Sequence, residues 1–237
     1  MRVAALYDIH GNLAALEAVL GELAHDPPDA IVVGGDVLWG PYQAECVELL
    51  RRLGALLLAG NCERDVLYGD SDGDRWCRAR LDADLLTSVA CWPATVELDV
   101  AGLGHVLFCH ATPRSDDEII TRLTPDVAVA EALAGAGADV VVCGHVHVQV
   151  DRAVPGAPRL VNAGSVGMPL EGKQGAFWAR LGVGAVELCR TAYEVDSALA
   201  RLRESGFPSV EDVFFEAVRG EITADSASEY FEGLRGA

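Results

Sequence analysis

The feature that most constrains the fold of this chain is a polar turn that follows an apolar run near the N-terminus. Residues Val3–Leu6 are all apolar and predict a short buried strand. They lead directly into Tyr7-Asp8-Ile9-His10-Gly11-Asn12, in which Asp8 and His10 are two residues apart. Side chains at this spacing project to the same side of a chain that leaves a strand. A carboxylate and an imidazole on one side can begin a divalent-metal site, although the same pattern also forms ordinary turns.

The first sixty residues alternate between strand and helix patterns. After Asn12, which can cap a helix, the apolar spacing predicts a helix at Leu13–Ala24. A strand at Ala30–Val33, a helix at about Gln43–Leu53 and a strand at Ala55–Leu58 follow. This order of elements predicts parallel strands in an α/β fold. In open parallel sheets, ligands bind beyond the carboxyl ends of the strands, which is where the polar turns of this chain lie.

The remainder of the chain is less regular. Residues 64–75 are rich in Asp, Arg and Gly, and we place the next helix only after them. Ala94–Val100 and His105–Cys109 predict a hairpin, and Asp139–Cys143 predicts an apolar strand. Short strands that we expect to form a second, antiparallel sheet lie at Arg159–Asn162, Gly175–Leu181 and Ala185–Arg190. Further helices are expected at Trp76–Val89, Pro125–Ala134, Tyr193–Ser205, Val210–Arg219 and Ser226–Leu234.

The length and composition fit one globular domain. The chain has 237 residues, of which 51% are hydrophobic and 23% charged, enough to bury a large core. We expect residues 1–207 to form this domain and residues 208–237 to form a helical extension of it, with Pro208 as the candidate boundary. The acidic residues beyond Pro208 favour either a solvated face or a contact in a homo-oligomer.

Charge and cysteine content exclude several classes of protein. The formal net charge of −18 argues against nucleic-acid and anionic-membrane partners, because binding phosphates needs clustered Lys and Arg. An acidic protein can still bind a phosphate ester when it holds divalent cations. No apolar run reaches the roughly 18 residues of a membrane helix. The seven cysteines are odd in number and include no CxxC pair, so we expect a soluble protein of the reducing cytoplasm.

Side chains of the metal-ligand type are concentrated in the turns that follow the predicted strands. Seven of them occupy such turns: Asp8, His10, Asp36, Asn61, His110, His145 and His147. The chain has only six histidines, and four of them belong to this set. His25 ends a helix and His105 starts a hairpin arm, so both are interpreted as structural residues.

The order of these residues resembles that of the calcineurin-like metallophosphoesterases, whose motifs run D-x-H, G-D, G-N-x-[DE], H and G-H-x-H. In this chain the motifs read Asp8-Ile9-His10, Gly35-Asp36, Gly60-Asn61-Cys62-Glu63, His110 and Gly144-His145-Val146-His147. Gly40-Pro41 and Asn162-Ala163-Gly164-Ser165-Val166-Gly167 further resemble a branch of small bacterial and archaeal phosphodiesterases. The resemblance covers about residues 1–205. It implies an α/β/β/α sandwich with two central mixed sheets flanked by helices.

The resemblance also implies a dinuclear-metal-dependent phosphoesterase, in the first place a phosphodiesterase, that acts on a small-molecule phosphoester. Asp8, His10 and His147 would hold one divalent ion; Asn61, His110 and His145 would hold the other; and Asp36 would bridge both. Such a pair of ions activates a shared hydroxide for in-line attack at phosphorus and stabilises the phosphoryl oxygens. The mixed nitrogen and oxygen ligands suit Mn, Fe, Zn, Ni or Co, among which the sequence does not choose.

Three positions depart from the pattern of this family. Gly40 stands where many relatives have a second Asp, a residue that usually lies outside the metal shell. Tyr7 precedes Asp8 where Ser is commoner, and it either lines the pocket or packs in the core. Cys62 replaces the His that protonates the leaving group in the phosphatase branch. A thiol is a poor substitute for that imidazole, so we predict a preference for phosphodiesters with good leaving groups. The alternative interpretation of Cys62 is a small buried apolar residue.

Outside the metal ligands, Arg114 is the candidate for contacting the substrate phosphate, because its planar guanidinium matches phosphate oxygens. The alternative is a surface arginine paired with Asp116 or Asp117. The tryptophans that could stack on a nucleobase, or simply belong to the core, are Trp39, Trp76 and Trp92. Backbone of residues 162–165 is a further candidate for substrate contact. Two other functions stay open: a phosphomonoesterase or protein phosphatase of the same fold, and a non-catalytic scaffold that binds partners.

Overall fold

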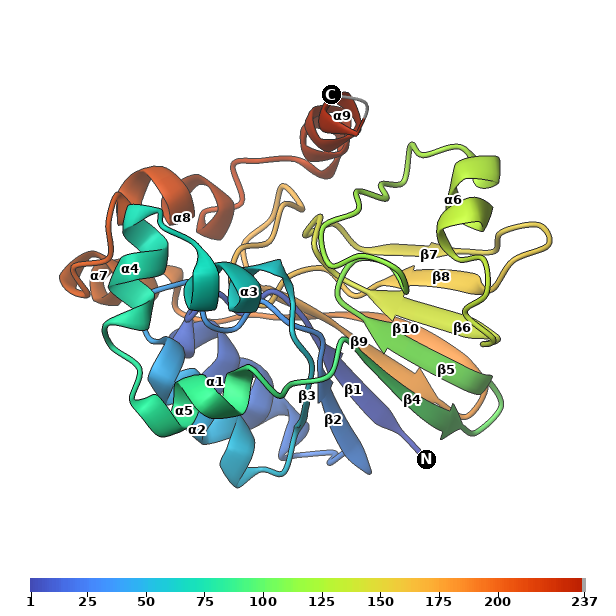
Figure 1. Ribbon diagram of the computed structural model, residues 1–237, viewed down its shortest axis with the longest axis horizontal. Coiled ribbons are helices and arrows are strands. Elements are labelled where there is room, and N and C mark those ends of the chain that lie inside the picture. The colour runs from blue at the N-terminus through green and yellow to red at the C-terminus, as the bar shows by residue number, and fades with distance from the viewer. Residues whose placement is uncertain (236–237) are drawn as a thin grey trace.

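The computed structural model describes residues 1–235, and two five-stranded sheets form its centre (Figure 1). The first sheet has the strand order β10-β9-β1-β2-β3, and the second has the order β4-β5-β6-β8-β7. Strands of the first sheet are β1 (Val3–Leu6), β2 (Ala30–Val33), β3 (Leu56–Leu57), β9 (Ala176–Gly182) and β10 (Ala185–Thr191). Strands of the second sheet are β4 (Thr95–Val100), β5 (Gly104–Cys109), β6 (Val140–Cys143), β7 (Val150–Arg152) and β8 (Arg159–Asn162).

The central strands β1, β6 and β9 are apolar on both faces because each sheet is covered on both sides near its middle. In β1, Val3 and Ala5 pack between the two sheets, whereas Ala4 and Leu6 pack against helices. In β5, Phe108 likewise faces the space between the sheets, and its neighbours face the outer layer. Strands buried on both faces read as continuous apolar runs rather than as alternating ones. The four-layer α/β/β/α sandwich implied by the sequence resemblance is therefore confirmed.

The helices form the two outer layers. The face of the first sheet that points away from the second is covered by four helices: α1 (Leu13–Leu23), α2 (Gln43–Arg52), α7 (Val195–Glu204) and α8 (Val210–Val218). The outer face of the second sheet is covered by α6 (Asp126–Ala132). The predicted cap of α1 is confirmed, since the Asn12 side chain accepts a hydrogen bond of 3.2 Å from the Ala15 amide. No helix within residues 1–235 is long and apolar enough to cross a bilayer.

The prediction of one helix at Trp76–Val89, preceded by an irregular segment, is wrong. The structure has three short helices there: α3 (Asn61–Tyr68), α4 (Asp72–Arg78) and α5 (Ala83–Val89). The Ser71 hydroxyl accepts a hydrogen bond from the Asp74 amide and starts α4, and the Asp82 carboxylate accepts one from the Leu85 amide and starts α5. These caps outweigh the apolar spacing that runs across both helices.

The prediction of a second, antiparallel sheet at residues 159–190 is also wrong. Strand β8 pairs in parallel with β6, while β9 pairs antiparallel with β1 and with β10. The seven-residue strand β9 is buried on both faces, with Ala179 and Leu181 toward the second sheet and Trp178 toward the helices. Such a strand needs neighbours on both edges, and these are contributed by distant segments of the chain. Strand β7 was not predicted.

The C-terminal residues complete the first helical layer. Phe214 and Phe215 of α8 pack with Phe207 in the same core cluster as Leu6 of β1. The last helix, α9 (Ala224–Leu234), lies apart from the other helices at the top of Figure 1. It contacts the loop after β5, where the Thr121 hydroxyl donates a hydrogen bond to Glu232 of α9. The division into residues 1–207 and a 208–237 extension stays a prediction.

Candidate metal centre

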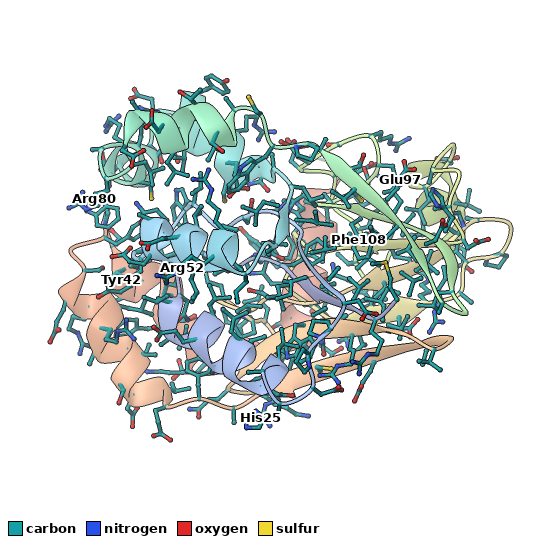
Figure 2. All side chains as sticks on the ribbon, turned by 90° about the horizontal axis from the view of Figure 1, so that it is seen from below. His25, Tyr42, Arg52, Arg80, Glu97 and Phe108 are labelled. Atoms are coloured by element: carbon teal, nitrogen blue, oxygen red, sulfur yellow. The ribbon has the colours of Figure 1, made fainter. Side chains whose placement is uncertain are left out.

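The loops at the carboxyl ends of β1, β2, β5 and β6, together with the first turn of α3, meet at one edge of the two sheets. They bring together all seven side chains that the sequence assigns to a metal site: Asp8, His10, Asp36, Asn61, His110, His145 and His147. His25 and His105 lie elsewhere, as expected; Figure 2 shows His25 at the edge of the molecule. The seven candidate ligands come from positions up to 139 apart in the chain, so the sheet topology is what assembles the site.

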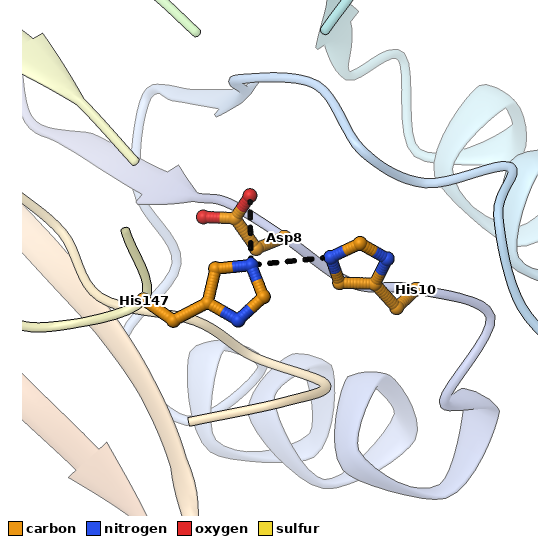
Figure 3. Close-up of side chains that lie close together, drawn as sticks. All are labelled: Asp8, His10 and His147. Atoms are coloured by element: carbon orange, nitrogen blue, oxygen red, sulfur yellow. Dashed lines mark hydrogen bonds and ion pairs between the residues drawn. The ribbon is translucent and has the colours of Figure 1, made fainter. Parts of the chain in front are cut away.

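One half of the site consists of Asp8, His10 and His147 (Figure 3). The Nε2 atom of His147 lies 3.5 Å from Asp8 Oδ1 and 3.2 Å from His10 Nε2. Asp8 is fully buried, and its Oδ1 is the one buried side-chain nitrogen or oxygen within residues 1–235 that lacks a hydrogen-bond partner. A buried carboxylate oxygen without a partner costs free energy unless a cation satisfies it. This oxygen therefore fits a metal ligand.

The other half of the site consists of His110, Asn61 and His145. One atom of the Asn61 amide lies 3.0 Å from His110 Nε2 and 3.1 Å from His145 Nδ1. Asp36 stands between the two halves, because its Oδ2 is 3.4 Å from His110 Nε2 and 3.8 Å from His10 Nε2. A single carboxylate within reach of both groups has the placement that a bridging ligand needs.

Five of these residues have a left-handed backbone conformation. The φ angles are 52° at Asp8, 47° at His10, 56° at Asp36, 68° at His145 and 58° at His147. Only two other non-glycine residues within 1–235 have a positive φ. Each such residue costs on the order of 1 kcal/mol and persists only where the surroundings enforce it. The strain of this fold is thus concentrated at the site, which indicates a functional constraint.

Three of the four imidazoles are oriented by backbone carbonyl groups. In each, Nδ1 lies in hydrogen-bonding distance of a carbonyl oxygen: His10 to Trp39 at 3.0 Å, His110 to Gly34 at 2.8 Å and His147 to Met168 at 2.7 Å. A proton on Nδ1 leaves the lone pair on Nε2, and Nε2 is the atom that points into the cluster. The backbone therefore selects the tautomer that can bind a metal.

Glu63 holds the loop that carries Asp36, a role that sequence reasoning missed. Its buried carboxylate accepts hydrogen bonds from the amides of Asp36 at 2.7 Å, Val37 at 2.8 Å, Leu38 at 3.0 Å and Gly60 at 2.7 Å. Burial, followed by the charge of Asp36, raises the pKa of Glu63. The signal was present in the sequence, since a Glu at the third position of a helix commonly bonds back to the residue before the helix.

The stretch at residues 162–165 also supports the loops of the site. Ser165 is fully buried, and its hydroxyl donates a hydrogen bond of 2.8 Å to the Asp8 carbonyl oxygen. The Asn162 amide donates one of 2.6 Å to the Gly144 carbonyl oxygen, directly before His145. In turn, the His145 amide donates one of 2.9 Å to the Asp8 carboxylate. These contacts tie the loops after β1, β6 and β8 to one another.

The electrostatics of the site favour ionised carboxylates. Burial alone would raise the pKa of Asp36, yet the neighbouring His110 and His10 lower it far below its ordinary value. Burial alone would lower the pKa of His110, and Asp36 and Asp8 raise it to about 10. Carboxylates and imidazoles so close together stabilise positive charge at this place. Mixed oxygen and nitrogen donors of this kind fit a divalent transition metal.

The structure explains two departures from the family pattern. A Cβ atom at Gly40 would lie 1.8 Å from the His10 carbonyl oxygen, so no side chain fits there while this loop keeps its course. Tyr7 is fully buried, and its hydroxyl donates a hydrogen bond of 2.9 Å to the Val142 carbonyl oxygen. Tyr7 was expected either to line the pocket or to pack in the core, and packing in the core is confirmed.

Cys62 lies at the rim of the site rather than in the core. Its amide donates a hydrogen bond of 2.9 Å to Asp36 Oδ1, and its sulfur lies within 4.8 Å of donor atoms of His10 and Asp36. The side chain is half-buried and lines the cavity over the site. Burial, followed by the charge of Asp36, raises the pKa of the Cys62 thiol well above its ordinary value.

Arg114 lies in the loop after β5 and lines the same cavity as His110. Its guanidinium is 57% exposed and pairs with Glu118, with Nε 2.9 Å from Oε2. The alternative partners Asp116 and Asp117 pair instead with Arg64. The role of Arg114 in binding phosphate stays a prediction.

The three tryptophans lie in different surroundings. Trp39 lines the cavity over the site, and its indole nitrogen donates a hydrogen bond of 3.1 Å to Asp74. Trp76 packs against Phe207, with the Arg80 guanidinium over its other side. Trp92 lines a separate cavity beside His110. Trp39 and Trp92 thus line the two cavities at the metal ligands, whereas Trp76 lines neither of them.

Comparison with known proteins agrees with this geometry. The model of the calcineurin-like phosphoesterase superfamily domain matches residues 1–182. An uncharacterized protein of Methanocaldococcus jannaschii is 28% identical over 232 residues, which cover 87% of this chain and 93% of that protein. The crystal structure of a metallophosphoesterase from Sphaerobacter thermophilus superposes with a TM-score of 0.75 at 25% identity, covering 93% of this chain and all of that one. A hypothetical protein from Pyrococcus horikoshii shares the fold, with a TM-score of 0.79, 18% identity and coverage of 94% and 99%.

Proposed function

Because this chain belongs to the calcineurin-like phosphoesterase superfamily, we propose that it is a hydrolase that cleaves small phosphodiesters with two divalent metal ions. The observation that carries the proposal is the position of Asp36. Its carboxylate lies within 3.8 Å of His10 and 3.4 Å of His110, between the two groups of ligands. A site for a single ion would not need a carboxylate shared by two groups.

The roles of the ligands follow from this placement. Asp8, His10 and His147 would hold one ion, and Asn61, His110 and His145 would hold the other, with Asp36 common to both. Two divalent ions at such a site lower the pKa of a water and neutralise charge on the phosphoryl oxygens. The identity of the metal is left open among Mn, Fe, Zn, Ni and Co.

The residues of the chain itself position and restrain these ligands. Glu63 fixes the Asp36 loop through four backbone amides, and backbone carbonyls keep Nε2 of three histidines directed at the cluster. Rigid placement of this kind raises affinity for the ions and avoids reorganisation during the reaction. Arg114, which lines the neighbouring cavity, is retained as a candidate for contacting substrate.

Cys62 is the basis for proposing a diesterase rather than a monoesterase. A general acid works best when its pKa is near the operating pH, and burial raises the pKa of Cys62 well above that. The thiol then gives little help to a leaving group that needs a proton. Diesters whose leaving group departs as a stable anion do not need this help.

The test compares bis(p-nitrophenyl) phosphate with ethyl phosphate, a monoester whose alkoxide leaving group needs a proton, in the presence of each candidate metal. We expect kcat/KM to be about 10-fold or more higher for the diester, and a chelator to abolish both activities. Cys62→His supplies an imidazole and should raise the monoester rate relative to the diester rate. A clear monoester preference of the wild-type protein would sink the assignment.

The cell compartment and partners remain part of the proposal. All seven cysteines are free thiols, which supports the reducing cytoplasm as the compartment. The net charge of −18 supports a small-molecule substrate over nucleic acid or a membrane surface. A homo-oligomer stays a prediction.

A further inference from the structure

A second cavity opens next to the candidate metal centre. It has a volume of about 520 Å³, against about 410 Å³ for the cavity over the metal ligands. Its wall includes His110, and it extends from there along the loop that follows β5. The residues that give it chemical character are Arg64, Trp92, His110, Arg114, Asp116 and Asp117. Of its lining residues, the proposed hydrolysis involves the metal ligand His110 and the candidate Arg114.

The two cavities are adjacent because Asn61 stands between them. One atom of its amide lies 3.1 Å from Nδ1 of His145, which lines the metal cavity, and 3.3 Å from the carbonyl oxygen of Asp116, which lines the second cavity. Arg64 follows Asn61 by three residues on α3, so both side chains lie on one face of that helix. A group attached to a phosphate at the metal ligands can therefore extend past Asn61 into the second cavity.

The charges in this cavity are already compensated. Arg64 Nη1 lies 2.5 Å from Asp116 Oδ1 and 3.6 Å from Asp117 Oδ2. The guanidinium of Arg114 makes two hydrogen bonds to the carboxylate of Glu118. Each cation is thus paired, and the two carboxylates in the wall would repel a second phosphate. The cavity suits a group without net charge.

The remaining groups match a ring that carries hydroxyls. Carboxylate oxygens of Asp116 and Asp117 accept hydrogen bonds, and the guanidinium of Arg64 donates them. The wall can therefore bind a hydroxyl that donates a hydrogen bond as well as one that accepts it. Trp92 adds a broad apolar surface, against which the carbon face of a sugar packs favourably. A few polar groups on an apolar wall are typical of a small-molecule site.

We propose that this cavity binds the uncharged, polyhydroxylated ring of one ester group, so that the preferred substrates are phosphodiesters of a nucleoside or a glycoside. This inference rests on the proposed function and names its substrate class. The ribose of a nucleoside and the pyranose of a glycoside share the chemistry that the cavity recognises. Diesters that carry a further phosphate on this group would be disfavoured.

The test uses two diesters with the same leaving group. Thymidine 5′-(p-nitrophenyl phosphate) carries a sugar on the retained side, and methyl p-nitrophenyl phosphate does not. We expect kcat/KM of the wild-type protein to be about 10-fold or more higher for the thymidine diester, since two or three hydrogen bonds and a stacking contact are gained. Equal values for the two substrates would overturn the inference.

Variants locate the preference in this cavity. Trp92→Leu and Asp117→Asn should each lower the ratio of the two kcat/KM values by about 3-fold or more, whereas Trp76→Leu, a matched tryptophan outside both cavities, should leave the ratio unchanged. A ratio cancels any general loss of folded or metal-loaded enzyme. An unchanged ratio in Trp92→Leu would contradict the assignment.

Binding is measured independently of hydrolysis by saturation-transfer NMR with the metal-loaded protein. Methyl β-ribofuranoside and methyl glucopyranoside distinguish the two sources of the ring, and adenine alone serves as the control for a base. We expect transfer to one of the two glycosides, and its loss in Trp92→Leu. Transfer confined to adenine would overturn the assignment to a sugar. Binding without any hydrolysis would contradict the proposed function alone, whereas hydrolysis without a ring preference would contradict this inference alone.

Discussion

Two regions of this molecule combine histidine with carboxylates, and they differ in their exposure to water. In the hairpin β4–β5, His105 Nε2 lies 3.0 Å from Glu97 Oε2 and Nδ1 lies 3.4 Å from Asp99 Oδ1, with side chains 37% to 93% exposed. Figure 2 shows Glu97 at the outer surface of this hairpin. In the metal centre, Asp36 lies 3.4 Å from His110, and neither side chain is more than 4% exposed.

The difference shows which pairs can form a binding site. Water screens the charges of the hairpin, so such pairs contribute little and their side chains stay mobile. In the metal centre the charges are strong because they are buried, and they stay in place because backbone groups and strained loops hold them. The same residue types therefore bind metal only where the fold removes water and fixes geometry.

The strongest challenge to this comparison is to change one buried and one exposed carboxylate in the same way. Glu63→Gln replaces an acceptor of four amides by a group that carries its own N–H donors. We expect the free energy of unfolding to fall by about 3 kcal/mol or more, because buried donors lose their partners. The matched change Glu97→Gln in the hairpin should cost less than about 0.5 kcal/mol. Urea denaturation measures the free energy of unfolding of both variants. Equal losses of this free energy would remove the distinction between the two regions.

A second variant measures how closely the site is packed. Gly40→Ala places a Cβ against the His10 carbonyl oxygen, so the loop that carries His10 must move. We expect a loss of about 1–3 kcal/mol in stability, together with weaker metal binding. The control is Gly21→Ala in α1, where the new Cβ meets open space and should stabilise by up to about 1 kcal/mol. If Gly40→Ala retained wild-type stability and metal content, the close packing of this loop would have no consequence.

The smallest effect concerns the hairpin. Hydrogen bonds to Asp99 and Glu97 raise the pKa of His105 above its ordinary value of 6.5. A raised pKa in the folded state means that the pairs stabilise the protein fully below pH 6.5 and lose this contribution as the pH rises through the folded pKa. Compared with His105→Gln, the wild-type protein should have its higher urea midpoint at pH 5.5, and the difference should shrink as the pH rises above 6.5. A difference that does not change with pH would contradict this account.

The sequence predicted the candidate site better than it predicted the fold around it. The ligands follow apolar strands, and the carboxyl ends of parallel strands meet at one edge, so Asp8 and Asp36 had to lie close together. The course of β9 could not be predicted, because its pairing with β1 is decided by burial on both faces of a sheet formed from distant segments. The division of residues 61–89 into three helices depends on caps at Ser71 and Asp82 that compete with apolar spacing.

The partners of side chains were the least predictable feature. Arg114 pairs with Glu118, whereas Asp116 and Asp117 pair with Arg64, which lies on another element. Proximity in the sequence suggested the wrong pairs because α3 approaches this loop only in the folded protein. The role of Glu63 is equally tertiary, since three of its four amide partners lie on the loop after β2.

The central claim is that Asp36 is shared by two cations, and metal content tests it most directly. Elemental analysis of protein purified without chelator should give a ratio near two divalent metals per chain. Asp36→Asn, which keeps the shape but removes the charge, should lose both metals together, because each half of the site depends on the same carboxylate. A ratio near one in the wild-type protein, or an Asp36→Asn variant that keeps its full metal content, would contradict the account.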